Sequence, residues 1–133
     1  MVSIRFRVVG LLVVAAALAC TGCRKGVGVQ ASKNVSIDTS CHADPDEVPL
    51  SYSARDQVVW KTPNAVTYTI TFKQIFPPFG QSSYTLQPAG SVPSGQISTS
   101  ASVCASVLGS CKYKYSIAGS NGCSYDPKVI INP

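Results

Sequence analysis

The sequence predicts an all-β domain, an antiparallel β-sandwich of about seven short strands. Two segments, 65–72 and 111–117, alternate apolar and polar residues with a period of two, which is typical of a strand with one buried face. Turn-rich stretches of proline, glycine and serine separate these segments from their neighbours. No stretch between Ser32 and Pro133 shows a helical period, so we expect no helix in the domain.

The clearest strand is the segment 65–72, whose sequence is AVTYTITF. It consists mainly of the β-branched and aromatic residues that strands favour, and one of its faces is formed by Val66, Tyr68, Ile70 and Phe72. The preceding segment, DQVVWK, places Val58 and Trp60 on one face. Because only the turn TPN at 62–64 separates the two segments, we expect them to form a hairpin.

The remaining segments are less regular. Pro77 and Pro78 prevent the strand ladder from continuing after the segment 65–72. Segments 83–87 and 96–104 are predicted as strands rich in serine and threonine. The last strand, 129–131, is apolar without alternation, as expected where both faces of a strand are covered.

The N-terminus has the three parts of a secretory signal peptide. Arg5 and Arg7 precede an apolar run at 8–19, and small residues end that run. The run is too short to span a membrane, since a spanning helix needs about 20 apolar residues. We therefore expect residues 1–19 to be removed on export.

Cys20 follows Ala17-Leu18-Ala19, and this pattern resembles a bacterial lipobox. In a lipobox the cysteine is acylated and becomes the new N-terminus. Two alternatives are acylation of Cys23 and ordinary cleavage at the same place, which would release a soluble protein. Residues 20–36, which are small, basic and aperiodic, are predicted to form a tether, and the domain is predicted to span residues 37–133.

Four cysteines remain in the predicted domain, and in an exported chain they imply two disulfides with three possible connectivities. The spacing of Cys111 and Cys123 favours a staple across a hairpin, which leaves Cys41 paired with Cys104. A zinc site is disfavoured, because the two-residue spacing of a zinc knuckle occurs only at the processing site.

Charge and composition argue against two functions. The chain carries a formal net charge of +5, but its lysines are scattered, whereas a nucleic-acid surface needs a basic stripe with interleaved aromatic residues. Catalysis is not expected either, because the single histidine and six carboxylates form no recognisable motif and no G-x-S-x-G elbow is present.

Four motifs follow one another after Ser51: a V-x-W strand after an acidic turn, a Y-T-I-T-F strand, a proline-phenylalanine loop, and a Y-x-Y-x-I segment before a Val-Ile strand. Together, from Ser51 to Pro133, they resemble the cupredoxin fold, and this resemblance implies a Greek-key β-sandwich. The likeness is closest to bacterial exported proteins of unknown function that keep this sandwich.

The resemblance does not extend to the copper ligands. Blue copper proteins bind their metal with two histidines, a cysteine and a weak axial ligand, usually methionine. The resemblance places Tyr68 and Ile117 where a histidine and the cysteine would stand. The only histidine is His42, and the only methionine is Met1, which would leave with the signal peptide. We therefore expect no copper site and no cofactor.

An alternative function is periplasmic metal handling. His42 with its acidic neighbours Asp44, Asp46 and Glu47 could bind a divalent ion weakly. The competing interpretation of this segment is a solvated acidic turn rich in proline.

The best candidate for a binding surface is the loop IFPPFG, in which proline stiffens the backbone between Ile75, Phe76 and Phe79. Aromatic side chains on a stiff loop bury well at an interface and lose little entropy. Alternatively, one of the phenylalanines closes the open end of the sandwich. The segment 96–104, taken as a sheet edge, is a second candidate for contact with a partner.

These observations predict a non-catalytic protein of the bacterial cell envelope that acts as a binding or structural module. It is expected to be exported and lipid-anchored, in the outer membrane or the periplasm. Its predicted contacts are the membrane, through a lipid on Cys20, and a protein partner in the envelope.

Overall fold

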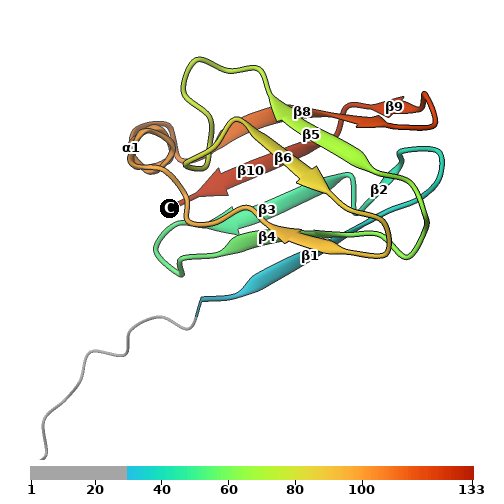
Figure 1. Cartoon of the computed structure of the whole chain (residues 1–133). Helices are drawn as coiled ribbons and strands as arrows, with labels where there is room; N and C mark the ends of the chain where they lie inside the picture. The colour runs from blue at the N-terminus through green and yellow to red at the C-terminus, as the bar shows by residue number, and fades with distance from the viewer. Residues whose placement is uncertain (1–29) are drawn as a thin grey trace, which may run out of the picture.

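The computed structural model describes residues 30–133, so the predicted signal peptide and the cysteines Cys20 and Cys23 lie outside the described residues. The described chain forms ten β-strands and one short α-helix (Figure 1), which confirms the all-β class. In chain order the elements are β1 (Ser32–Ile37), β2 (Ala43–Asp44), β3 (Glu47–Ser51), β4 (Gln57–Lys61), β5 (Tyr68–Phe72), β6 (Ser83–Leu86), β7 (Ser91–Pro93), α1 (Thr99–Leu108), β8 (Cys111–Gly119), β9 (Ser124–Tyr125) and β10 (Lys128–Asn132).

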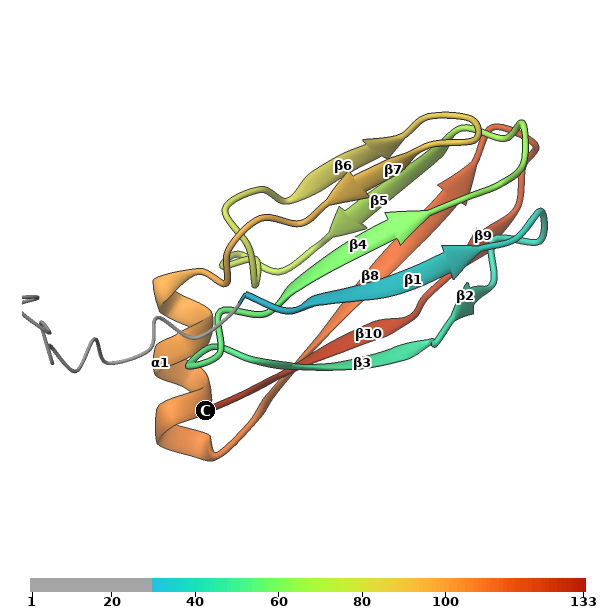
Figure 2. The ribbon, with the colours of Figure 1, turned by 90° about the horizontal axis from the view of Figure 1, so that it is seen from below.

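The strands form two sheets that pack as a sandwich (Figure 2). The first sheet has the order β2-β1-β4-β7, and the second has the order β3-β10-β8-β5-β6, with β9 also paired to β8. The chain passes from one sheet to the other five times: between β2 and β3, β3 and β4, β4 and β5, β6 and β7, and, through α1, between β7 and β8. These crossings place sequence neighbours on opposite faces of one core.

Both sheets are mixed, which corrects the prediction of a purely antiparallel sandwich. Strand β1 runs parallel to β4, with Ser32 opposite Gln57, and β10 runs parallel to β3, with Lys128 opposite Glu47. Parallel neighbours need a long connection between them. Here β2 and β3 form that connection between β1 and β4, because they carry the chain through both sheets.

The predicted hairpin between the segments around Trp60 and Tyr68 is wrong. Strand β4 lies in the first sheet, whereas β5 pairs with β6 and β8 in the second. The connection 62–67 is held in the fold by Thr62, whose Oγ1 donates a hydrogen bond to the carbonyl of Ile37 at 3.0 Å. Alternation along a strand shows which face is buried, but it does not show which strand is the partner.

The predicted strand faces are correct and form the core. Tyr68, Ile70 and Phe72 are buried, and Trp60 lies at the centre of an aromatic cluster. Its ring lies 5.7 Å from that of Tyr115, and its Nε1 donates a hydrogen bond to the Tyr115 hydroxyl at 3.2 Å. The other members of the cluster are Phe72, Phe79 and Tyr84.

Helix α1 replaces the strand predicted at 96–104. The side chain of Ser98 accepts a hydrogen bond from the backbone N–H of Ala101, and Gly109 ends the helix in the left-handed conformation with φ of 80°. Ala101 and Ala105, four residues apart, face the sandwich and are fully buried. The many serine and β-branched residues disguised this helix, since both types have modest helix propensity.

The domain begins earlier than predicted. Strand β1 starts at Ser32, inside the segment 20–36 that was expected to be a tether. Val35 and Ile37 have no exposed surface, so β1 is a full part of the core and the boundary at residue 37 is too late. Two apolar residues among small polar ones are too short a pattern to predict a strand.

All four cysteines of the domain form disulfides, as predicted, but the predicted pairing is wrong. Cys41 bonds to Cys123 and Cys104 bonds to Cys111, with Cα separations of 5.6 and 6.1 Å. Cys111 and Cys123 cannot meet, because the nine-residue strand β8 runs between them and spans about 27 Å.

Two disulfides are typical of a protein that folds in an oxidising compartment outside the cytoplasm. Within residues 30–133, no helix is both long enough and apolar enough to cross a membrane.

Candidate functional site

The sandwich has two different ends. We call one the helix end: it carries α1, the loop 73–82 between β5 and β6, and the turn 52–56 between β3 and β4 (Figure 1). Tyr52 links two of these segments, because its hydroxyl accepts a hydrogen bond from Ser106 of α1 at 3.0 Å.

We call the opposite end the turn end, and it carries the connections 38–42, 62–67 and 119–123. These connections are tied to one another. The backbone N–H of Ser120 donates to the carbonyl of Thr67 at 2.9 Å, and Asn121 Nδ2 donates to the carbonyl of Thr39 at 2.7 Å.

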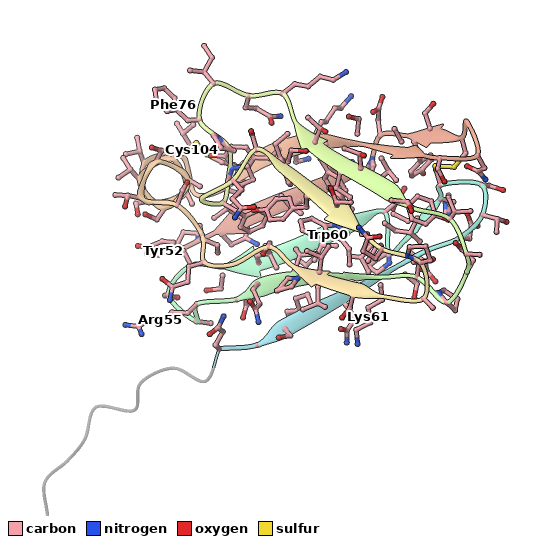
Figure 3. The ribbon with its side chains drawn as sticks, viewed as in Figure 1. Tyr52, Arg55, Trp60, Lys61, Phe76 and Cys104 are labelled. Atoms are coloured by element: carbon pink, nitrogen blue, oxygen red, sulfur yellow. A yellow bond between two sulfur atoms is a disulfide. The ribbon has the colours of Figure 1, made fainter. Side chains whose placement is uncertain are left out.

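Exposed apolar side chains are concentrated at the helix end. Within residues 30–133, five large hydrophobic side chains are exposed, and all of them belong to the loop 73–82 or to α1. We call them the apolar surface residues, and their exposed fractions are 90% for Ile75, 67% for Phe76, 55% for Val103, 75% for Val107 and 72% for Leu108. Figure 3 shows Phe76 on the loop beside α1.

The structure divides the predicted partner loop. Ile75 and Phe76 are exposed, whereas Phe79 is only 1% exposed and lies edge-on to Trp60 and Phe72 at 6.2 and 5.6 Å. Phe79 is therefore the phenylalanine that closes the sandwich, and it is not available to a partner.

The loop is held on both sides of its exposed residues. Before them, Gln74 Nε2 donates a hydrogen bond to the carbonyl of Lys114 at 2.8 Å. After them, Ser98 donates to the carbonyls of Pro77 and Pro78, at 3.0 Å from its hydroxyl and 2.8 Å from its backbone N–H. Ile75 and Phe76 are thus presented by an ordered backbone, which lowers the entropic cost of burying them.

Helix α1 adds apolar residues that sequence reasoning missed, because its segment was predicted as a strand. Val103 and Val107 are four residues apart and therefore lie on the same side of the helix, opposite the buried alanines. The disulfide between Cys104 and Cys111 fixes the helix to β8. The signals that could have revealed it are the cap at Ser98, the glycine after Leu108 and this four-residue spacing.

Charge differs between the two ends. In the three segments of the helix end the only acidic residue is Asp56, which is 6% exposed and accepts a hydrogen bond from the backbone N–H of Ser51 at 3.0 Å. Arg55 of the turn 52–56, labelled in Figure 3, is exposed at this end. Lys73 of the loop 73–82 is exposed as well. Toward the turn end, by contrast, lie the exposed carboxylates of Asp38, Asp44 and Asp46.

The acidic neighbours of His42 are engaged separately. The His42 ring packs at 4.9 Å from that of Tyr125, whose hydroxyl donates to Asp46 at 3.4 Å, while Glu47 pairs with Lys128 at 2.6 Å. Desolvation, and then the nearby Asp46 carboxylate, raise the pKa of the Tyr125 hydroxyl. Residues 30–133 contain no group of three or more histidine, cysteine or acidic residues that could hold a metal ion.

The positions that the resemblance assigns to copper ligands are occupied by core residues. Tyr68 and Ile117 have no exposed surface. The Tyr68 hydroxyl donates to the carbonyl of Asp38 at 2.7 Å and accepts from Asn64 Nδ2 at 2.8 Å. No protein-family model matches the chain, and no curated protein matches its sequence.

Proposed function

We propose that this protein is a non-catalytic module of the bacterial cell envelope, exported and held at a membrane by a lipid on Cys20, which acts by contact through its helix end. Export is supported by the signal-like N-terminus and by the two disulfides. Two or more acyl chains on Cys20 would supply a stable anchor, because each buried methylene contributes about 0.8 kcal/mol.

The observation that carries a contact function is the placement of the apolar surface residues. Burying one large apolar side chain yields roughly 1.5 to 3 kcal/mol, so five on one end of a small domain form a substantial contact. Groups of exposed apolar side chains are typical of interaction sites.

A cupredoxin-like Greek-key arrangement without copper ligands is the fold that we propose. It is supported by the five crossings between the sheets, and by the burial of the aromatic residues that carry the resemblance, Trp60, Tyr68 and Tyr115. No observation favours metal handling at His42 over a solvated turn.

The test is the intact mass of the exported protein, before and after reduction, for the wild type and for Cys20→Ser. We expect a diacyl or triacyl mass on the wild type, two reducible disulfides, and membrane association. Cys20→Ser should lose the acyl mass, and a larger share of it should be recovered in the soluble fraction than of the wild type. Cys23→Ser is the matched control and should keep both properties, whereas an unmodified and soluble wild type would overturn the anchor.

A further inference from the structure

We propose that the helix end is a membrane-contacting surface, whose apolar surface residues enter the interface of the same bilayer to which Cys20 anchors the chain. This inference rests on the proposed lipid anchor and adds what the contact surface binds: an anionic lipid bilayer.

The path of the chain supports this orientation. The described chain begins at Gln30, and it does so at the helix end, where the carbonyl of Ala31 accepts a hydrogen bond from the backbone N–H of Gln57, next to the turn 52–56. Figures 1 and 2 both show this start of the chain on the same side of the sandwich as α1.

The distance to the anchor is limited. Residues 21–29 separate Cys20 from Gln30, so ten residue steps join the two residues and reach at most about 35 Å. A chain that is anchored at Cys20 and enters the domain at the helix end holds this end nearer to the bilayer than the turn end. We therefore assign the membrane contact to the helix end, which also carries the exposed apolar side chains.

The side chains suit this contact. Interfacial segments place large apolar residues about 5 to 10 Å into the boundary between headgroups and acyl chains, and they add to a covalent lipid as a second signal. Ile75 and Phe76 stand on a loop held at both ends, and Val103, Val107 and Leu108 stand on a disulfide-bonded helix. Both supports can insert side chains without unfolding.

The charges favour an anionic surface over a neutral one. Arg55 and Lys73 lie at or beside the helix end, and Arg24 and Lys25 lie in the segment that connects it to Cys20. Cationic residues beside an apolar surface strengthen its binding to anionic lipids. The exposed carboxylates of Asp38, Asp44 and Asp46 lie toward the turn end, away from the bilayer, whereas Asp126 lines one hollow together with Lys73 and Lys114.

The first experiment measures depth in the bilayer. Acylated full-length mature protein carrying Phe76→Trp is reconstituted in phosphatidylcholine and phosphatidylglycerol vesicles that contain brominated acyl chains. The fluorescence of the new tryptophan is obtained by subtracting the signal of the wild type, which has only the buried Trp60. On vesicle binding we expect this fluorescence to shift to the blue and to be quenched by the bromine atoms. Thr39→Trp, at the turn end, is the matched control and should be neither shifted nor quenched. Equal quenching of the two variants would overturn the orientation.

The second experiment removes the anchor. Cys20→Ser protein, exported and cleaved, is co-sedimented with phosphatidylglycerol vesicles, alone and with Phe76→Ser plus Leu108→Ser. We expect the double substitution to lower the partition coefficient about tenfold or more, because the lost apolar area no longer enters the interface. Ala65→Ser with Ala118→Ser, also exposed, is the matched control and should leave partition unchanged.

These experiments separate the inference from the proposed function. If the wild type carries no acyl mass but its vesicle binding depends on Phe76, the proposed lipid anchor is wrong and the proposed membrane-contacting surface stands. If the protein is acylated but Phe76→Trp is not quenched, the lipid anchor stands and the proposed membrane-contacting surface is wrong. A wild-type dimer that Phe76→Ser converts to a monomer, measured by sedimentation, would assign the surface to a second copy of the chain and overturn the inference.

Discussion

The two ends of the sandwich differ in how they are held and in what they expose. The turn end is closed by bonds between distant parts of the chain: the disulfide Cys41–Cys123 joins residues 82 positions apart, and Asn121 reaches the carbonyl of Thr39. The helix end is closed by the disulfide Cys104–Cys111, which spans only seven positions, and it exposes large apolar side chains. One end secures the fold and the other presents a surface.

The difference has an energetic consequence. On the chain-entropy model, the long disulfide contributes about 4.5 kcal/mol and the short one about 2.4 kcal/mol. Exposed side chains at the helix end contribute little to folding, since surface substitutions usually change stability by about 0.5 kcal/mol or less. The helix end can therefore carry a contact function that the rest of the fold does not depend on.

The largest expected effect separates the two disulfides. Cys41→Ser with Cys123→Ser should lower the free energy of unfolding by about 4.5 kcal/mol, because the unfolded chain gains the most freedom from the longest loop. Thermal and urea unfolding followed by circular dichroism measure this loss. Cys104→Ser with Cys111→Ser is the comparison and should cost about half as much. If this pair costs more than Cys41→Ser with Cys123→Ser, the helix end, and not the turn end, is the one that secures the fold.

The next prediction concerns the different contributions to stability of the two phenylalanines in the loop 73–82. Phe79→Ala should cost about 3 to 5 kcal/mol of folding free energy, because it leaves a cavity beside Trp60. Phe76→Ala should cost about 0.5 kcal/mol or less, while weakening vesicle binding. Urea unfolding and co-sedimentation of both variants test this division. Similar destabilisation by the two substitutions would place Phe76 in the core.

A third prediction concerns the aromatic core that both ends share. Burial raises the pKa of Tyr115 to about 12, whereas the unfolded chain releases the same proton near its ordinary pKa of about 10. Above pH 10 the unfolded state loses this proton first, so stability falls as pH rises to about 12, by roughly 2 kcal/mol. Urea unfolding across this range measures the fall.

The control for this prediction is Tyr115→Phe, which should show a smaller fall over the same pH range, although it removes the hydrogen bond from Trp60. A fall remains in this variant, because burial also raises the pKa of Tyr84. The assignment to Tyr115 is lost if wild type and variant fall equally.

The fold was predictable where information is local. Alternation correctly assigned the buried face of the strand around Ile70, because a period of two is visible within a few residues. It did not assign β4 and β5 to different sheets, nor the parallel pairing of β1, because partner choice depends on contacts between distant segments. The pairing of Cys41 with Cys123 depends on the same long-range arrangement.

The candidate site was predictable only in part. Ile75 and Phe76 are neighbours in the sequence beside two prolines, so their loop could be identified directly. Whether Phe79 is buried or exposed could not be decided from the sequence, because only its packing against Trp60 distinguishes a ring that closes the core from one that is free to bind a partner. Val103 and Val107 were missed because their common side exists only if the segment is a helix.

The smallest predicted effect is the change in folding free energy when a methyl group is added to a glycine at each end. A Cβ on Gly119 would lie 2.5 Å from Asn121 Oδ1 and 2.6 Å from Cys123 Sγ, whereas a Cβ on Gly80, in the loop 73–82, would meet nothing within 4 Å. Gly119→Ala should therefore cost about 1 to 3 kcal/mol, while Gly80→Ala should be close to neutral. Urea unfolding of both variants decides the comparison. If Gly119→Ala is as stable as Gly80→Ala, the turn end has room that its disulfide and side-chain contacts would not allow, and it is not the more tightly closed of the two.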